Sequence, residues 1–171
     1  MNIRLKDKVC VITGGATGMG GLASSLFAQE GAKVVIGDLK EEESRKLSEE
    51  IKRQGGEASP MALDVSSEKE CEKLIQQCVK TYGGVDVLYN NAGIFPQEDH
   101  SILDTPETIY DKVFAVNVKG TVLCSRYAVP EMIKRGKGSV INIASFVALL
   151  GCTVPQDAYT CLLYTSPSPR D

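Results

Sequence analysis

Short apolar segments alternate with longer amphipathic segments along most of this chain, and that alternation limits its fold more than any other feature. Five short, mainly apolar segments are predicted as strands, at residues 8–13, 33–37, 58–65, 85–89 and 138–145. The segments between them carry apolar side chains at helical spacing, at residues 20–29, 41–54, 68–82 and 106–134. We expect the last of these helices to break near residues 117–120.

Strands that alternate with helices in this way indicate parallel strands joined by crossover helices. The predicted fold class is therefore α/β, with a doubly wound parallel sheet between two helical layers, truncated after the fifth strand. Pro60 has no N–H to donate, which favours an edge position for the third strand. One domain is expected over residues 1–160, followed by a tail at residues 161–171.

A glycine-rich segment, Thr13 to Gly20 (TGGATGMG), follows the first predicted strand and opens the first predicted helix. Glycine lets the backbone turn tightly and approach a ligand that a Cβ atom would exclude. The N-terminus of the following helix presents free N–H groups and a positive dipole end, which suit a pyrophosphate. This context predicts a dinucleotide site, whereas a glycine cluster alone would indicate only a turn.

Asp38 ends the second predicted strand, where a carboxylate can accept hydrogen bonds from an adenosine ribose. The same carboxylate would repel a 2′-phosphate, so NAD(H) is favoured over NADP(H); the non-basic Thr17 agrees, while Lys40 would weaken the preference. Asp64 and Val65 end the third predicted strand. Asp64 either meets the adenine amino group or caps the next helix, and the sequence leaves both open.

Asn90 to Gly93 (NNAG) closes the fourth predicted strand. With this motif, the chain resembles the classical short-chain dehydrogenase/reductase family. The resemblance rests also on the glycine spacing at 13–20, Asp38, Asp64, Asn117, Ser145 and Tyr159. The resemblance implies a Rossmann-type fold and a cytoplasmic oxidoreductase that acts on a small alcohol or ketone. It also implies a parent protein of about 250 residues that forms a homodimer or homotetramer.

The resemblance also implies roles for single residues. Tyr159 would exchange the proton of the substrate hydroxyl, Ser145 would stabilise the charge that develops on the substrate oxygen, and Asn117 would organise a water molecule. Cofactor contacts are expected from Gly14, Thr17, Gly18, Met19, Gly20, Asp38, Leu39, Asp64, Val65, Asn91, Ala92 and Gly93.

Leu163 departs from the family pattern, which places a lysine four residues after the tyrosine to lower its pKa, since a free tyrosine titrates near ~10. Pro167 and Pro169 then exclude a continuing helix. Residues 161–171 (CLLYTSPSPRD) can be encoded by a nucleotide string that resembles the transposon-end adapter of sequencing libraries. We therefore expect a non-native, disordered tail, a bare fifth strand, and an unstable, inactive chain as written.

Composition excludes several other functions. The net charge of −3 offers no basic excess to attract nucleic acid or anionic lipid, so a small molecule is the expected partner. No apolar segment approaches the length of a membrane span. The six cysteines are irregularly spaced and only one histidine is present, which favours free thiols and predicts no metal site.

The sequence thus predicts an NAD(H)-dependent oxidoreductase that transfers a hydride between a secondary alcohol or ketone and nicotinamide. One alternative is an NADPH-dependent 3-oxoacyl reductase of fatty-acid synthesis, against which Asp38 argues. A second alternative is a regulatory protein that binds NAD without turnover, against which Ser145 and Tyr159 argue.

Overall fold

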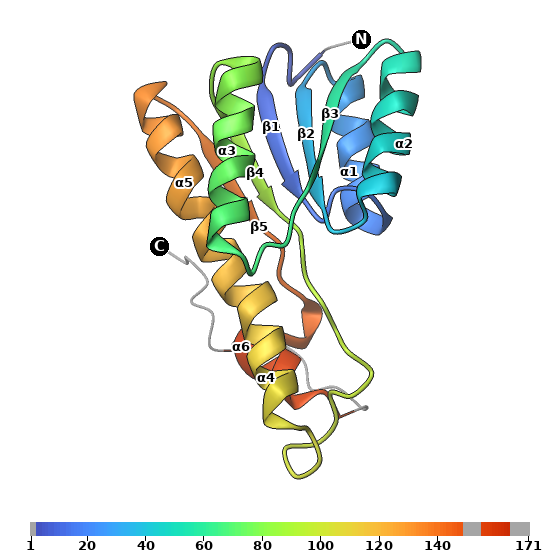
Figure 1. The fold of residues 1–171 in the computed structure, drawn as a ribbon, viewed down its shortest axis with the longest axis vertical. Coiled ribbons are helices and arrows are strands. Elements are labelled where there is room, and N and C mark those ends of the chain that lie inside the picture. The colour runs from blue at the N-terminus through green and yellow to red at the C-terminus, as the bar shows by residue number, and fades with distance from the viewer. Residues whose placement is uncertain (1–2, 149–154, 165–171) are drawn as a thin grey trace.

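The computed structural model describes residues 3–148 and 155–164, and its centre is a parallel sheet with strand order β3-β2-β1-β4-β5 (Figure 1). The strands are β1 (Val9–Thr13), β2 (Lys33–Asp38), β3 (Glu57–Ala62), β4 (Val87–Asn90) and β5 (Ser139–Asn142). Because β1 is central and the chain winds outward from it in both directions, the order reverses between β1 and β4. The predicted doubly wound α/β architecture is confirmed, and β3 lies at an edge, as Pro60 indicated.

Helices cover both faces of the sheet. One face carries α1 (Gly18–Gln29) and α2 (Glu41–Arg53), and the other carries α3 (Glu68–Tyr82) and α5 (Gly120–Lys134), whereas α4 (Glu107–Phe114) and α6 (Asp157–Tyr164) lie beyond the end of the sheet (Figure 1). A π-helical segment, η1 (Ala115–Lys119), joins α4 to α5, and a 3₁₀ turn, η2 (Phe146–Ala148), follows β5. None of the helices in the described part of the chain is long and apolar enough to cross a membrane.

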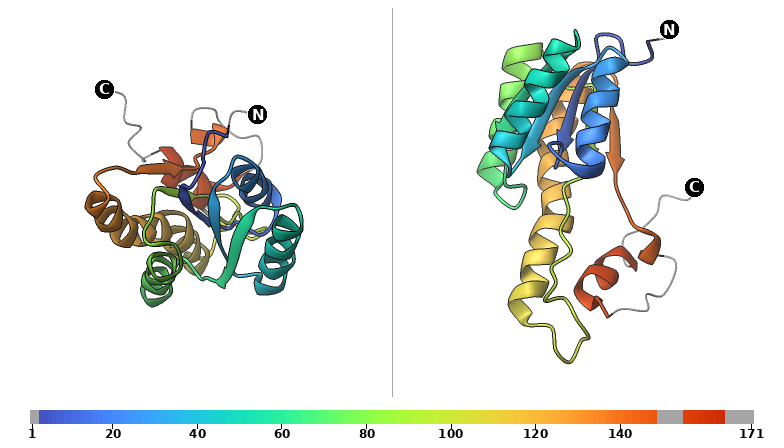
Figure 2. Two further views of the ribbon diagram at one scale, coloured as in Figure 1. Left: turned by 90° about the horizontal axis from the view of Figure 1, so that it is seen from above. Right: turned by 90° about the vertical axis from the view of Figure 1, so that its right-hand side faces the viewer.

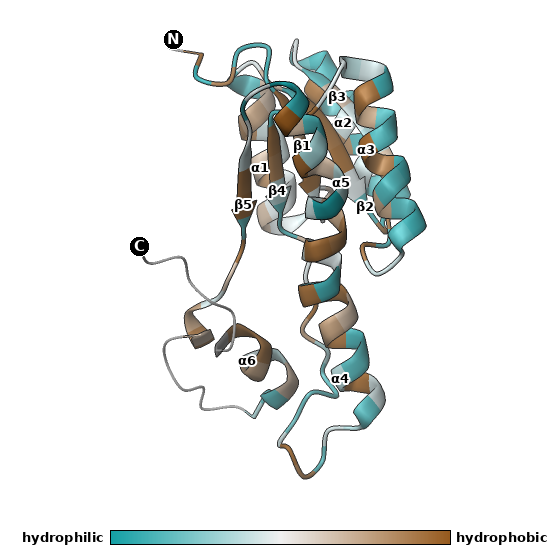
Figure 3. Cartoon of the chain, turned by 90° about the vertical axis from the view of Figure 1, so that its left-hand side faces the viewer, coloured by the Kyte–Doolittle hydropathy of each residue, from teal (hydrophilic) through white to brown (hydrophobic). Residues whose placement is uncertain are grey.

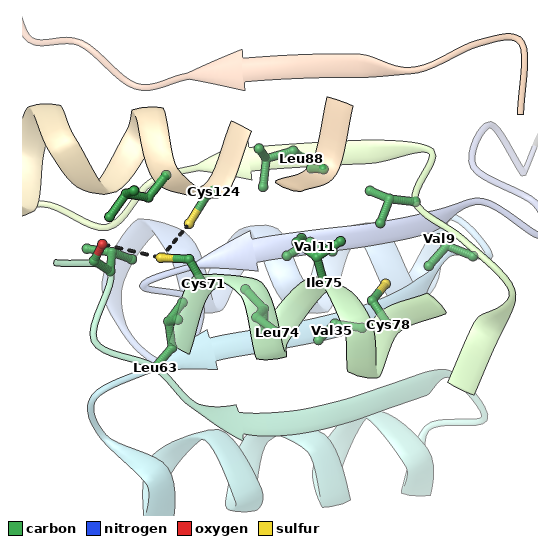
Figure 4. Close-up of a cluster of buried hydrophobic side chains, with 14 of the residues drawn as sticks. Val9, Val11, Val35, Leu63, Cys71, Leu74, Ile75, Cys78, Leu88 and Cys124 are labelled. Atoms are coloured by element: carbon green, nitrogen blue, oxygen red, sulfur yellow. Dashed lines mark hydrogen bonds between the residues drawn. The ribbon is translucent and has the colours of Figure 1, made fainter. Parts of the chain in front are cut away.

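Strand β1 is buried on both faces, which explains why its sequence is continuously apolar. Val9 and Val11 face α3 and α5, whereas Cys10 and Ile12 face α1 and α2. Figure 4 shows the first of these layers, where the Sγ atoms of Cys71 on α3 and Cys124 on α5 lie 3.6 Å apart. Both thiols are fully buried; Cys124 donates to the Cys71 sulfur, and Cys71 donates to the Val65 carbonyl oxygen at 3.3 Å.

The region below the sheet is built from α4, α6 and the loop that leaves β4 (Figure 1; Figure 2, right). Helix α6 packs on α4 through Val113, Ala158 and Leu162, all of them buried. The disorder expected from residue 161 onward is therefore wrong for residues 161–164, because Leu162 is 5% exposed in this contact and extends α6 to Tyr164. The rest of the expected tail, residues 165–171, lies outside the described residues.

Two helix predictions differ from the structure for local reasons. Pro106, the predicted first residue of the fourth helix, is extended (φ −62°, ψ 144°) and precedes the first turn of α4, which begins at Glu107. The break expected at residues 117–120 is a π-helical segment. Gly120 continues the helix, because its missing Cβ makes room for Val65, 2.7 Å from where that atom would lie.

Strand β5 forms the other edge of the sheet in the described part of the chain, and all four of its residues are exposed (Figure 3). Val140 and Ile141 project to opposite faces, and each is 37% exposed. The bare fifth strand expected from the sequence is therefore present.

Candidate cofactor and substrate site

The glycine-rich loop connects β1 to α1 in a conformation that side chains would block. Gly14 has φ +62° and lies against Ala92, whose Cα atom would be 2.9 Å from an added Cβ. At Gly20, an added Cβ would overlap the carbonyl oxygen of Gly14. Gly18 also has a positive φ of +56°, but open space surrounds it. The loop is therefore a cradle in which glycines bring the main chain close to the cavity, as a pyrophosphate requires.

The end of β4 fixes this loop through Thr13 and Asn91. The Thr13 hydroxyl accepts the N–H groups of Asn91 and Ala92, both at 3.1 Å. The Asn91 amide donates to the carbonyl oxygens of Thr13 at 3.2 Å and Gly14 at 3.0 Å. These bonds join the two strands at the point where the strand order reverses, which is where α/β sheets bind ligands.

Asp38 is tied to both neighbouring loops. One carboxylate oxygen accepts the Ala16 N–H at 3.0 Å, and the other accepts the Lys40 N–H at 3.0 Å. A carboxylate oxygen can accept more than one hydrogen bond, so Asp38 keeps acceptor capacity for hydroxyl groups. Its orientation toward the cavity is thus set by the main chain rather than by a ligand.

These elements enclose a first cavity of about 390 Å³. It is lined by ten of the predicted cofactor residues: Gly14, Thr17, Met19, Asp38, Leu39, Asp64, Val65, Asn91, Ala92 and Gly93. The predicted contacts Gly18 and Gly20 are not among the lining residues; they shape the loop instead. Lys40, Leu63, Ile94 and Val116 also line it and were not predicted as cofactor contacts.

Asp64 does not cap α3, whose N-cap residue is Ser67. Its carboxylate accepts the N–H and the hydroxyl of Ser66, at 2.9 and 2.7 Å. Glu70 reaches back from the first turn of α3 and accepts the Asp64 N–H at 2.7 Å. Of the two interpretations that the sequence left open, the helix-capping one is wrong, and Asp64 lies in the cavity wall.

A second cavity of about 250 Å³ adjoins the first and shares Met19 and residues 91–94 with it. Asn117, Ser145 and Tyr159 all line this second cavity, although they come from η1, the loop after β5 and α6. Its described lining residues include no charged side chain. Leu163 lines the same wall where the sequence pattern led us to expect a lysine.

Asn117 is held by a two-way hydrogen bond to the strand extension after β4. Its side-chain oxygen accepts the Ile94 N–H at 2.8 Å, and its side-chain amide donates to the Ile94 carbonyl at 2.9 Å. The π-helical geometry of η1 changes the local hydrogen-bond pattern of the helix, and such segments are frequent at functional sites. Asn117 therefore sets the wall that the two cavities share.

Tyr159 is placed by contacts that sequence reasoning missed. Its ring packs against Phe95 with 5.6 Å between ring centroids, and its backbone N–H donates to the buried Asp99 carboxylate at 2.8 Å. Asp99 and Tyr159 are 60 positions apart in the chain, and no local pattern signals their contact. In the described part of the chain, no cluster of three or more His, Cys, Asp or Glu is placed to hold a metal ion.

Comparison with known proteins relates this arrangement to oxidoreductases. A family model described as short chain dehydrogenase matches residues 8–161. An uncharacterized oxidoreductase of Thermotoga maritima is 43% identical over 149 residues, which cover 87% of this chain and 58% of the relative. The 3-oxoacyl-(acyl-carrier-protein) reductase FabG of the same organism is 39% identical over 149 residues, covering 87% of this chain and 60% of the relative.

A third relative is the 2,5-dichloro-2,5-cyclohexadiene-1,4-diol dehydrogenase LinX of Sphingobium indicum, 41% identical over 149 residues that cover 85% of this chain and 58% of the relative. The crystal structure of gox2181 matches with a TM-score of 0.89 and 25% identity, over 94% of this chain and 62% of that chain. The chain thus spans about 58% of the length of the first curated relative.

Proposed function

Because this chain belongs to the short chain dehydrogenase family, we propose that it is part of a cytoplasmic, NAD(H)-dependent oxidoreductase. The reaction is hydride transfer between a secondary alcohol or ketone and nicotinamide. One observation carries the proposal: a cavity built on the glycine cradle and Asp38 adjoins a cavity lined by Asn117, Ser145 and Tyr159. A dinucleotide in the first cavity would supply the hydride acceptor or donor at their shared wall.

Three residues of the second cavity have definite tasks in this proposal. The Tyr159 hydroxyl exchanges a proton with the substrate oxygen, and the Ser145 hydroxyl donates a hydrogen bond to the same oxygen as charge develops there. Asn117 fixes the wall through Ile94 and organises a water molecule near the tyrosine. The uncharged lining suits an uncharged alcohol or ketone, since a charged group would lose its hydration without gaining a partner.

Because this chain has Leu163 where the family pattern has a lysine, we assign turnover to a complete protein that carries a lysine at position 163. A tyrosine without a nearby cation is a poor base at neutral pH, because its ordinary pKa is near ~10. The complete protein is proposed to be a homodimer or homotetramer. Val122 and Ile133 on α5, 51% and 71% exposed, supply apolar surface for such contacts.

The test is coenzyme binding to this chain, followed by turnover in a version completed to the length of its relatives and carrying a lysine at position 163. Calorimetry is expected to show NADH binding more tightly than NADPH, and the completed protein is expected to oxidise secondary alcohols. Absence of binding to either coenzyme would sink the proposal. Binding without turnover on a broad alcohol panel would instead favour a regulatory NAD-binding protein.

A second candidate, an NADPH-dependent 3-oxoacyl reductase, is favoured by one observation. Lys40 lines the first cavity beside Asp38 and could offer its ammonium group to a 2′-phosphate. Tighter binding of NADPH than of NADH, together with reduction of a 3-oxoacyl thioester by the completed protein, would select this candidate.

A further inference from the structure

The carboxylate of Asp99 is buried against the first turn of α6, the helix that carries Tyr159. Asp99 is only 2% exposed. Its Oδ1 atom accepts the Ala158 N–H at 3.0 Å, and its Oδ2 atom accepts the Tyr159 N–H at 2.8 Å. Both oxygens therefore bind N–H groups that have no partner within the helix, at the end where the helix dipole favours negative charge.

A second carboxylate reinforces the connection from the other side. Asp157 accepts the Ile102 N–H at 2.6 Å through its side chain, and its own N–H donates to the His100 carbonyl at 3.0 Å. Four hydrogen bonds thus join residues 99–102, in the loop between β4 and α4, to the first three residues of α6. The loop that carries Phe95 and the helix that carries Tyr159 are held as one unit.

The buried carboxylate of Asp99 has lost its hydration, and the hydrogen bonds to α6 compensate for that loss. Among the ion pairs of residues 3–148 and 155–164, none includes Asp99. A buried carboxylate is costly unless hydrogen bonds replace its hydration. Here the replacement comes from the N–H groups of α6, so displacement of the helix would leave the charge unsolvated.

Helix α6 depends on tertiary contacts to hold its position. It contains eight residues, and an isolated helix of that length is not stable in water. Ala158 and Leu162 anchor it on α4, but an apolar contact fixes direction less strictly than hydrogen bonds do. Tyr159 itself lies on the cavity side and touches Phe95.

We infer that Asp99 is a positioning residue for Tyr159: its carboxylate fixes the first turn of α6 and thereby the place of the tyrosine hydroxyl in the substrate cavity. The inference rests on the proposed function for its kinetic consequence. Asp99 does not touch the reacting atoms, and its effect passes through the main chain of Ala158 and Tyr159.

The test compares Asp99→Asn and Asp99→Ala with the matched control Asp104→Asn. Asp104 is an exposed aspartate of the same loop, and its carboxylate accepts the Ser101 hydroxyl. Asparagine keeps one acceptor oxygen but turns an NH₂ donor toward an N–H group, whereas alanine removes both acceptors. Hydrogen exchange of the α6 amides is measured in this chain, and kcat, KM and NADH affinity are measured in the completed protein.

Both Asp99 variants are expected to speed exchange of the Ala158 and Tyr159 amides and to lower kcat, on the order of 10²-fold for alanine. NADH affinity is expected to stay unchanged, because the first cavity contains neither residue, and this also shows that the variants fold. Unchanged kcat in both variants, with or without faster exchange, would overturn the inference. If even the unmodified completed protein shows no turnover, the proposed function fails, and the exchange rates alone decide whether Asp99 holds α6.

Discussion

Leu163 lies one helical turn after Tyr159 on α6, and both residues line the same cavity. The half-buried Leu163 side chain packs against the cluster of Val113, Ala158 and Leu162. In the proposed function this cavity holds the proton-exchanging tyrosine, yet its described lining residues include no charged side chain to make that tyrosine effective near neutral pH.

Exchange of this one residue is expected to decide turnover. In a version of the completed protein that keeps Leu163, the change Leu163→Lys is expected to raise kcat for alcohol oxidation by on the order of 10²-fold or more, because the ammonium group stabilises the tyrosinate. Leu163→Met, which keeps the size and lacks the charge, is the control and is expected to leave kcat low. Equal rates for the lysine and methionine variants would contradict this role.

Coenzyme choice is expected to follow Asp38. Asp38→Asn removes the charge and one acceptor while keeping the cavity shape, and it is expected to weaken NADH binding about 10-fold. The ratio of NADPH to NADH affinity is expected to rise. Calorimetry measures both, with Glu41→Gln as a control that removes an exposed charge from the same segment. An equal change in the control would show that only general electrostatics is at work.

Because the main chain at Gly20 lies close to the Gly14 carbonyl, Gly20→Ala is expected to abolish NADH binding. The added methyl group overlaps the Gly14 carbonyl and pushes the loop into the cavity. Ser25→Ala on the same helix removes only a hydrogen bond to the Gly21 carbonyl and is expected to bind NADH normally. Fluorescence titration with NADH separates the two, and normal binding by Gly20→Ala would contradict the cradle geometry.

The ion pair between Arg135 and Asp86 is expected to contribute far more to the free energy of unfolding than the neighbouring pair between Lys134 and Glu131. Asp86 is 4% exposed and accepts from Arg135 at 3.1 Å and from the Val9 N–H at 2.9 Å. Arg135→Ala would leave a buried carboxylate unpaired and is expected to cost roughly 3 kcal/mol. Lys134→Ala removes an exposed pair to Glu131 and is expected to cost about 0.5 kcal/mol or less in urea unfolding.

Stability is expected to fall at alkaline pH because of Cys10 and Cys78. Burial raises the pKa of each thiol from 9.0 to about 12 in the folded chain. The neutral thiols thus favour the fold fully below pH 9.0, and this contribution declines as the pH rises toward 12, because only the unfolded chain then releases these protons.

Urea unfolding between about pH 8 and 10.5 measures this slope, which is at most about 1.4 kcal/mol per pH unit for each thiol. Cys10→Ala and Cys78→Ala are expected to reduce the slope, even though each also lowers stability at neutral pH. Cys161→Ala, at an exposed position, is the control. A slope that is the same in all variants would contradict the assignment.

The strands, the first three helices and the glycine cradle could be predicted because their signals are local. The β1 segment is continuously apolar, and the glycines follow it directly. Asp38 was found by the same logic, since a strand end in a parallel sheet has a known place in space. Ten of the twelve predicted cofactor residues line one cavity for this reason.

Contacts between distant segments could not be predicted in this way. Asp99 meets Tyr159 across 60 positions, and Asn117 pairs with Ile94 across 23, through main-chain groups that every residue carries. The helix break predicted near Gly120 rested on the usual tendency of glycine to interrupt a helix. In the structure the glycine continues the helix, because the Val65 side chain occupies the place of a Cβ atom. These relationships depend on tertiary packing and become visible only in three dimensions.

The wall of the first cavity is complete by Val116, whereas the second cavity extends to Leu163. In the proposed function, coenzyme binding thus rests on residues up to Val116, whereas turnover also needs the later residues Ser145 and Tyr159. Replacement of the later residues alone would leave a protein that binds the dinucleotide without turning it over. The same division would let evolution change the chemistry without rebuilding the coenzyme-binding site.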